Sequence, residues 1–339
     1  MAFQKNSKND SNKSADSSDE SDSECEYDST WENEEIDRTK RSRRRWSRRN
    51  LRAAEDMWNY RHNYPGRKMD NDLQNTDQPN LQFYRNKRPS SPDGVYIDGF
   101  HNQWWGDYDK LEWVHSYIQW LFPIEEDGMN YSAFKLTKAE IKSFQKDEDA
   151  KERLLKSYQM MLDFYGIKLV DEETGKVERA DNWEDRFDNL NRNTNNNLRI
   201  THILKCLGTL GFQHYQAPLV RFFLTETLVK KTLPRVKSSV LDYFMFAVLD
   251  KDERRELVKY AFKNFEPKGD FVWCPKWIQK RFLEEYTQKE TRAKDSDEAI
   301  DMESNSNKDT PGNTEVKQMN VQEDNQEEPV QGVSTPFAQ

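Results

Sequence analysis

The chain has 339 residues, a formal net charge of −9 and a charged fraction of 33%, yet 12% of its residues are aromatic. Its apolar side chains must therefore be concentrated in part of the chain, which is long enough for one large domain or two small ones. The three cysteines, Cys25, Cys206 and Cys274, lie too far apart for a disulfide framework or a zinc motif, and the longest apolar run, 241–249, is about half of what a membrane-spanning helix needs.

Two acidic stretches with few apolar residues flank a helical middle. Residues 1–40 and 288–339 are rich in Ser, Asp, Glu, Asn and Gln, so they cannot bury enough apolar surface to offset the entropy of ordering. We predict disordered acidic tails over 1–40 and 288–339, an arginine-rich segment over 41–52 and a helical domain over 53–287. The amino terminus lacks the apolar stretch of a secretory leader, so we expect a protein of a reducing compartment that is not secreted.

The middle of the chain carries apolar residues at helical spacing. One helix is predicted over 109–121, where Pro123 stops it. A second is predicted over 147–165, with Gly166 as a left-handed end. Further helices are predicted around the apolar stripes at 200–210, 220–228, 241–248 and 257–265.

Capping and loop residues mark the ends of these helices. Thr137 followed by Glu140 has the spacing of a capping box, and the asparagine-rich stretch 189–197 is typical of a loop. The other predicted helix caps are Asn197 and Ser238 or Ser239. No sheet is expected beyond a short β pair near 95–97. Short loops between successive helices favour an all-α fold, a compact multi-helix bundle or array.

Several stretches of five or more residues, in the same order along the chain, resemble the opioid growth factor receptor family over about residues 25–280. The matching stretches are Cys25–Trp31, Tyr60–Pro65, Asn80–Asn86, Ser116–Pro123, Phe164–Leu169, Asn197–Thr201, Ala217–Leu224, Leu241–Val248 and Phe271–Trp273. The resemblance implies an α-helical domain that is unrelated to the seven-helix opioid receptors. It also implies binding of an enkephalin-type peptide, Tyr-Gly-Gly-Phe-Met, and restraint of cell proliferation from the nucleus or perinuclear cytoplasm. Mammalian receptors of this family carry imperfect carboxy-terminal repeats, which this chain's acidic tail lacks, as does a receptor-like relative.

An arginine cluster is the sharpest local signal in the sequence. Its basic residues are Lys40, Arg41, Arg43, Arg44, Arg45, Arg48 and Arg49. Such a cluster can engage an acidic import-receptor groove, phosphates or anionic lipid. We interpret it as a nuclear-targeting element that binds a nuclear import receptor. Peripheral contact with the nuclear envelope and nucleic-acid binding are alternatives, as is a solvated helix face that packs through Trp46, Ala53 and Met57.

Four serines are candidate phosphorylation sites. Ser17, Ser21 and Ser23 lie in acidic surroundings of the kind that acidophilic kinases prefer, although a low-complexity tail has the same composition. Ser47 lies inside the arginine cluster, where a phosphate would lower the local positive charge and could regulate import.

The segment Trp104, Trp105, Asp107, Asp109 and Trp113 is a candidate peptide pocket. A carboxylate can receive the amino-terminal cation of an enkephalin, and indole rings can form the walls around its apolar side chains. The competing interpretation is structural: Asp107 or Asp109 caps the following helix and the tryptophans belong to the core.

No residue pattern indicates an enzyme, a metal site or a cofactor. His115 follows Glu112, but no nucleophile accompanies it, so we interpret it as an ordinary helical histidine. The other histidines lack metal-ligand spacing, and Cys206 lies on an apolar helix stripe. We therefore predict a non-catalytic peptide receptor without cofactor or metal. The alternative is a nuclear scaffold or adaptor that binds nucleic acid or proteins through its arginine segment and helical domain.

Overall fold

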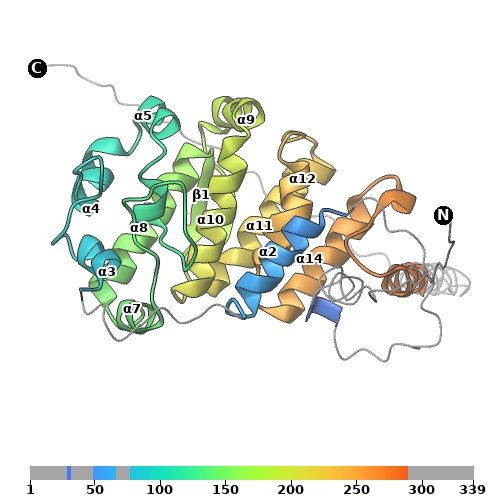
Figure 1. Cartoon of the computed structure of the whole chain (residues 1–339). Helices are drawn as coiled ribbons and strands as arrows, with labels where there is room; N and C mark the ends of the chain where they lie inside the picture. The colour runs from blue at the N-terminus through green and yellow to red at the C-terminus, as the bar shows by residue number, and fades with distance from the viewer. Residues whose placement is uncertain (1–28, 32–48, 66–76, 289–339) are drawn as a thin grey trace, which may run out of the picture. The chain divides into compact units, whose positions relative to one another are not determined.

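Helices built on the apolar stripes dominate the part of the chain that the computed structural model describes, which is residues 29–31, 49–65 and 77–288 (Figure 1). The predicted all-α fold is confirmed, with one two-stranded hairpin added. Most of the two stretches predicted to be acidic tails lies outside the described residues. No helix of the described residues is both long and apolar enough to cross a bilayer.

The first long helix is α2 (Leu51–Arg61). Asn50 caps it, because its side-chain oxygen accepts a hydrogen bond from the Ala53 backbone N–H at 3.1 Å. Ala53, Met57 and Tyr60 are buried on one face of α2, as their spacing of three or four residues requires.

Several short helices follow. They are α3 (Pro79–Tyr84), α4 (Ile97–Gly99), which continues as the π-helical turn η3 (Phe100–Trp104), α5 (Tyr108–Trp113) and α6 (Ile118–Leu121). The single helix predicted over 109–121 is wrong, because the chain breaks between α5 and α6. The break is stabilised by Arg199, whose guanidinium donates to the carbonyl oxygens of Leu111 at 2.7 Å and Val114 at 3.2 Å. The β pair near 95–97 is also wrong, since Ile97 begins α4.

The helices α7 (Lys138–Phe144) and α8 (Glu148–Phe164) both begin after a capping side chain, of which Thr137 was predicted. Thr137 accepts from the Glu140 N–H at 3.1 Å, and Asp147 accepts from the Ala150 N–H at 2.9 Å. The Glu140 side chain does not complete a capping box. It is buried and instead accepts from the Asn80 and Leu81 N–H groups at the start of α3.

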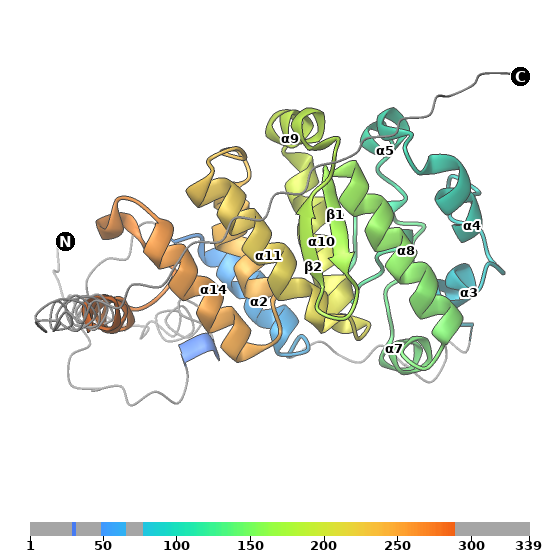
Figure 2. The ribbon, with the colours of Figure 1, turned by 180° about the vertical axis from the view of Figure 1, so that it is seen from behind.

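An antiparallel hairpin, β1 (Ile167–Asp171) and β2 (Lys176–Arg179), follows α8. Gly166, at φ +75°, reverses the chain after α8 as predicted. The hairpin packs against both α8 and α11 (Figure 2). No sheet was expected here because β1 alternates buried and more exposed residues over only five positions, too few to distinguish from a loop.

The helices α9 (Trp183–Arg192) and α10 (Asn195–Thr209) correct the prediction of a loop over 189–197. Most of the asparagines lie in the last turn of α9 and the first turn of α10, so Asn197 is inside a helix and is not its cap. Asparagine side chains here hydrogen bond across the junction: the Asn189 and Asn196 amides both donate to Glu112, at 2.7 and 3.0 Å.

The remaining helices form the carboxy-terminal half of the packed chain. The short turn η4 (Gln213–Tyr215) leads into α11 (Gln216–Leu224), which has the π-helical extension η5 (Thr225–Val229). The next helix begins as α12 (Lys237–Ser239) and continues through η6 (Val240–Phe244) into α13 (Met245–Ala247). The last two elements are α14 (Lys251–Asn264) and η7 (Lys268–Asp270). Ser238 and Ser239 lie within α12 and do not cap it. Residues 276–288 are helical as well.

One part of the core lies where α10, α11, α13 and α14 pack on one another and on α2; the labelled helices α2, α10, α11 and α14 lie together in both views (Figures 1 and 2). Phe223 and Phe244 are fully buried in this part, with ring centroids 5.5 Å apart. A second part lies around α3 and α6, where Phe83 and Trp120 are buried with ring centroids 5.4 Å apart. Large aromatic rings bury roughly 150–250 Å² each, so this aromatic core offsets much of the entropy lost on ordering the chain. Cys206 is fully buried, as predicted for a core residue.

Candidate functional site

A loop between α6 and α7 forms the outer wall of a hollow. The Leu136 N–H donates to the Ile124 carbonyl oxygen at 2.9 Å, so the chain leaves and re-enters the packed helices at nearly the same point. Gly128 allows Gln119 to lie against this loop, because a Cβ at Gly128 would come within 1.9 Å of the Gln119 amide nitrogen. A larger residue at position 128 would therefore displace the end of the Gln119 side chain.

Asn130 fixes the middle of the loop to the helices beneath it. Its side-chain amide donates to the carbonyl oxygens of Ser91 at 2.8 Å and Ser116 at 3.1 Å, and its oxygen accepts from the Ser132 N–H at 3.0 Å. One side chain thus joins three backbone segments, and the loop is held by hydrogen bonds that do not depend on its exposed residues.

Aromatic side chains lie along the same loop. Phe134 packs edge-on against Trp120 at 5.9 Å between ring centroids, and the Arg88 guanidinium lies 4.8 Å from the Phe134 ring. Tyr131 is 96% exposed. Exposed rings next to a hollow are the kind of surface that binds an apolar side chain of a ligand.

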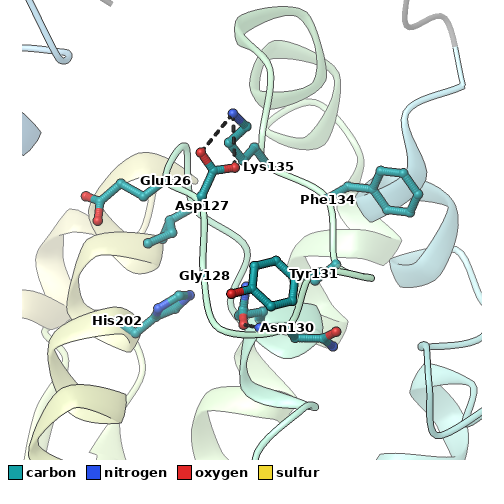
Figure 3. A pocket seen from close by; sticks show the side chains of 11 residues that line it. Glu126, Asp127, Gly128, Asn130, Tyr131, Phe134, Lys135 and His202 are labelled. Carbon is teal, nitrogen blue, oxygen red and sulfur yellow. Dashed lines mark hydrogen bonds and ion pairs between the residues drawn. The ribbon is translucent and has the colours of Figure 1, made fainter.

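The hollow has a volume of about 170 Å³ and is closed on its inner side by α10 (Figure 3). Its lining residues are Gln119, Ile124, Glu126, Asp127, Gly128, Asn130, Tyr131, Ala133, Phe134, Lys135 and His202. Binding sites for whole small molecules span about 300–1,000 Å³, so this hollow suits one side chain or chain terminus of a larger ligand.

His202, on α10, supplies the inner polar group of the hollow. Burial lowers the pKa of its imidazole to about 4, so the ring is neutral at pH 7. The Phe122 backbone next to the ring opposes this shift only in part. The Nε2 atom of His202 is buried and has no hydrogen-bond partner within the described residues. In a neutral imidazole one ring nitrogen donates and the other accepts, so Nε2 has a hydrogen-bonding capacity that these residues do not use.

The two carboxylates of the hollow have different surroundings. Glu126 receives hydrogen bonds from Tyr64 and from the buried Lys205 ammonium at 2.7 Å, and Lys205 also bonds Asp56 at 2.8 Å. Asp127 is exposed and pairs with Lys135 at 3.1 Å. Because an exposed ion pair contributes only about 0–1 kcal/mol, Asp127 can exchange its partner for a ligand cation, whereas Glu126 is held in a buried network.

The predicted pocket residues 104–113 do not line this hollow. Trp104 is buried against Phe100 and Tyr117, with centroids 4.6 and 5.5 Å apart. Asp107 caps α5 by accepting from the Lys110 N–H at 3.1 Å. The other three, Trp105, Asp109 and Trp113, are exposed, Trp113 to 80%. The structural interpretation therefore holds for Trp104 and Asp107.

Of the predicted nuclear-targeting residues, only Arg49 lies within the described residues. Its side chain is buried, with the guanidinium 4.9 Å from the Phe246 ring. The candidate phosphorylation sites Ser17, Ser21, Ser23 and Ser47 lie outside the described residues, as do Lys40, Arg41, Arg43, Arg44, Arg45 and Arg48.

The prediction that His115 is helical is wrong. His115 lies between α5 and α6, where it contacts Arg199. Burial, followed by the Arg199 charge, lowers its pKa. In the described part of the chain, no three His, Cys, Asp or Glu residues gather in a way that could hold a metal ion.

Sequence reasoning missed His202 because the histidines are scattered. A usable signal was present: Arg199, His202 and Lys205 recur every third residue among the apolar residues of α10. Such spacing places them along one side of α10, and polar residues on a buried face need partners. Arg199 and Lys205 have protein partners, whereas the Nε2 of His202 does not.

These features describe an α-helical domain with a small polar hollow beside α10. The chain belongs to the opioid growth factor receptor family, since the opioid growth factor receptor (OGFr) conserved region matches residues 73–279. It is 52% identical over 234 residues to the human opioid growth factor receptor and 50% identical over 228 residues to the mouse opioid growth factor receptor-like protein 1.

These alignments cover 69% and 67% of this chain but only 34% of the human receptor and 48% of the mouse receptor-like protein. The chain therefore spans between a third and a half of these curated relatives. No solved structure is significantly similar to it.

Proposed function

We propose that this chain is a non-catalytic receptor that binds an enkephalin-type peptide in the hollow beside His202. Bound peptide would restrain cell proliferation from the nucleus and perinuclear cytoplasm. The observation that carries the proposal is the Nε2 atom of His202, which has no partner within the described residues and belongs to a side chain that lines the hollow. The ligand class is supported by the names of the human and mouse relatives, opioid growth factor receptors.

The peptide Tyr-Gly-Gly-Phe-Met matches the polar groups of the hollow. Its phenol hydroxyl can donate to the Nε2 atom of His202, and its terminal ammonium can replace Lys135 beside Asp127. A space of about 170 Å³ admits one such side chain. The remaining apolar side chains of the peptide would pack on the exposed Tyr131 ring.

The lining of the hollow supports a role in binding without catalysis. Its one histidine is a weak base, because burial holds the pKa of His202 at about 4 and general bases work best when their pKa lies near the working pH.

Calorimetric titration of the full chain with Tyr-Gly-Gly-Phe-Met tests the proposal. We expect binding that weakens roughly tenfold to a hundredfold in His202→Leu, because the phenol would lose its buried acceptor. The matched controls are Trp105→Ala and Asp109→Ala, which change exposed residues of the other candidate pocket. Full affinity in His202→Leu together with lost affinity in Trp105→Ala would move the site to residues 104–113. No heat of binding in the folded wild-type chain would refute the receptor function.

We infer that import of the chain depends on Lys40, Arg41, Arg43, Arg44, Arg45 and Arg48, which bind a nuclear import receptor. Arg49 would contribute less, because its guanidinium packs on Phe246. Replacing Arg43, Arg44 and Arg45 by Gln should move a fluorescent fusion to the cytoplasm, whereas Arg52→Gln should not. If the triple variant keeps its nuclear location, import does not use this cluster.

The alternative of a nucleic-acid-binding scaffold predicts a different salt response. Contacts between arginine and phosphate lose affinity steeply as salt rises, whereas a peptide held largely by an imidazole and aromatic rings would lose little. Titrations at two salt concentrations with the peptide and with a short duplex therefore separate the two functions.

A further inference from the structure

The short turn η1 (Ser29–Trp31) packs into the domain although residues 32–48 separate it from the next described segment. Thr30 is fully buried and Trp31 is 3% exposed. The partner of η1 is α14. Thr30 and Trp31 are therefore packed against the domain, although they fall within residues 1–40, which were predicted to be a disordered tail.

Two neighbouring arginines of α14 hold Thr30. The Arg254 Nε donates to the Thr30 hydroxyl oxygen at 2.8 Å, and the Arg255 Nε donates to the Thr30 carbonyl oxygen at 2.9 Å. The Trp31 ring lies 5.7 Å from the Arg255 guanidinium and 6.1 Å, edge-on, from the Phe282 ring. These contacts define a docking surface made of Arg254, Arg255 and Phe282, which we call the α14 groove for short.

Three features favour reversible docking of η1 on the α14 groove. A segment tied to its groove by a linker binds intramolecularly, so even a weak interaction keeps the groove filled. The indole N–H of Trp31 is buried and finds no acceptor within the described residues, which weakens the docking. A segment this short can also open without unfolding the helices beneath it.

We propose that Thr30 is a phosphorylation site and that its phosphorylation releases η1 from the α14 groove. A protein kinase would transfer the γ-phosphoryl group of ATP to the Thr30 oxygen when η1 is undocked. The new bond joins that oxygen to phosphorus, the bond from phosphorus to ADP breaks, and the hydroxyl proton leaves to the kinase. Asp28, Glu32 and Glu34 surround Thr30 in sequence, as in substrates of acidophilic kinases.

The phosphorylated segment does not fit the groove. The Thr30 hydroxyl is completely enclosed, whereas a phosphate adds three oxygens and a charge of about −1.5 to −2. Arg254 already contacts the Thr30 hydroxyl, and it cannot move aside for the phosphate without breaking the bonds that its Nη1 donates to the carbonyl oxygens of Val248 at 2.6 Å and Leu249 at 3.1 Å. Phosphorylation therefore switches the α14 groove from covered to open.

A synthetic peptide of residues 24–36 tests the switch in trans. Trp31→Ala removes the ring contacts of η1 with Arg255 and Phe282, so we expect it to leave the α14 groove open in the full chain. Calorimetry then measures how the unmodified and the Thr30-phosphorylated peptides bind to this variant. We expect the unmodified peptide to bind and the phosphorylated one to bind at least thirtyfold more weakly. Equal or tighter binding of the phosphopeptide would show that Arg254 and Arg255 form a phosphate receptor, which overturns the proposal. Failure of the unmodified peptide to bind the folded variant overturns it as well.

Hydrogen exchange in the intact chain gives an independent test if Trp31→Ala fails to fold. Thr30→Glu should speed amide exchange around residues 29–31 at least tenfold relative to wild type. The matched variant Thr30→Ser keeps the hydroxyl that accepts from Arg254 and should change exchange by only a fewfold. Equal exchange in wild type and Thr30→Glu contradicts the proposal.

Discussion

The segment 104–113 and the hollow between residues 119–135 and α10 contain the same kinds of side chain, but the fold uses them differently. In the first, Asp107 caps α5 and Trp104 fills the core, so both are satisfied within the protein. In the second, His202 keeps a ring nitrogen without a partner in the described residues, and Asp127 has only an exposed ion-pair partner among the contacts found there. Composition alone therefore does not identify a binding site. What distinguishes the hollow is polar capacity that the protein leaves unused.

Substitution of Arg199, which bonds to the carbonyl oxygens at the end of α5, is expected to have the largest effect and tests whether segment 104–113 is structural. Arg199→Met should lower the free energy of unfolding by about 3–5 kcal/mol, since it removes a buried cation that satisfies the carbonyl ends of α5. Urea unfolding measures the change. Arg192→Met, at a side chain that is 79% exposed, should change stability by no more than about 0.5 kcal/mol. Equal effects of the two substitutions would show that Arg199 does not hold the break between α5 and α6.

The pH dependence of stability tests the buried state of His202. The pKa of His202 is about 4 in the folded chain and ordinarily 6.5, so between these values the unfolded chain binds the extra proton. The contribution of His202 to stability is therefore lost as pH falls through this range. The His202→Gln variant lacks this loss and should gain about 2 kcal/mol relative to wild type between pH 7.5 and pH 4.5.

Equilibrium unfolding of the wild-type and variant chains at several pH values measures this difference. His101, whose pKa burial also lowers to about 4, should behave similarly when changed to Gln. A constant difference between wild type and His202→Gln across the range would mean that His202 is not held neutral in the hollow.

Asp127 and Asp109 form a matched pair of exposed carboxylates, one in each region. Asp127→Asn should weaken binding of the pentapeptide about twofold to fivefold, as expected for one exposed charge pair, and Asp109→Asn should leave it unchanged. The difference should shrink at higher salt, because exposed charges are screened. If Asp109→Asn has the larger effect, segment 104–113 carries the amino-terminal contact.

Trp113 is expected to have the smallest effect. Because 80% of its surface is exposed, Trp113→Ala should change stability by less than about 0.5 kcal/mol and should leave peptide affinity unchanged. Chemical denaturation and calorimetry measure the two quantities. If the Trp113→Ala chain is stable but binds the pentapeptide more weakly than wild type, Trp113 is part of the binding surface.

Local patterns in the sequence predicted what local interactions determine. The apolar spacing of α8, its cap Asp147 and its left-handed end Gly166 all follow from neighbouring residues. The break after α5 depends on Arg199, which lies more than eighty positions away in the sequence, so no local pattern indicated it. Glu140 illustrates the same limit, since its spacing matched a capping box while its carboxylate caps a different helix.

The candidate site was harder to predict than the fold for the same reason. The hollow needs a loop after α6, a histidine on α10 and a glycine that lets Gln119 approach. None of these residues stands out in the sequence. The hollow exists only because the fold brings them together. The arrangement of Thr30 against α14 likewise joins residues more than two hundred positions apart.

The most direct test of the account is the imidazole nitrogen resonance of His202 in the full chain, with selectively ¹⁵N-labelled histidine, during titration with the pentapeptide. Acceptance of a hydrogen bond from the peptide phenol should shift the Nε2 resonance of His202, and an otherwise identical peptide with phenylalanine in place of its tyrosine should not reproduce the shift. If the pentapeptide saturates the chain while the His202 resonance stays unmoved, the hollow is not where the peptide binds.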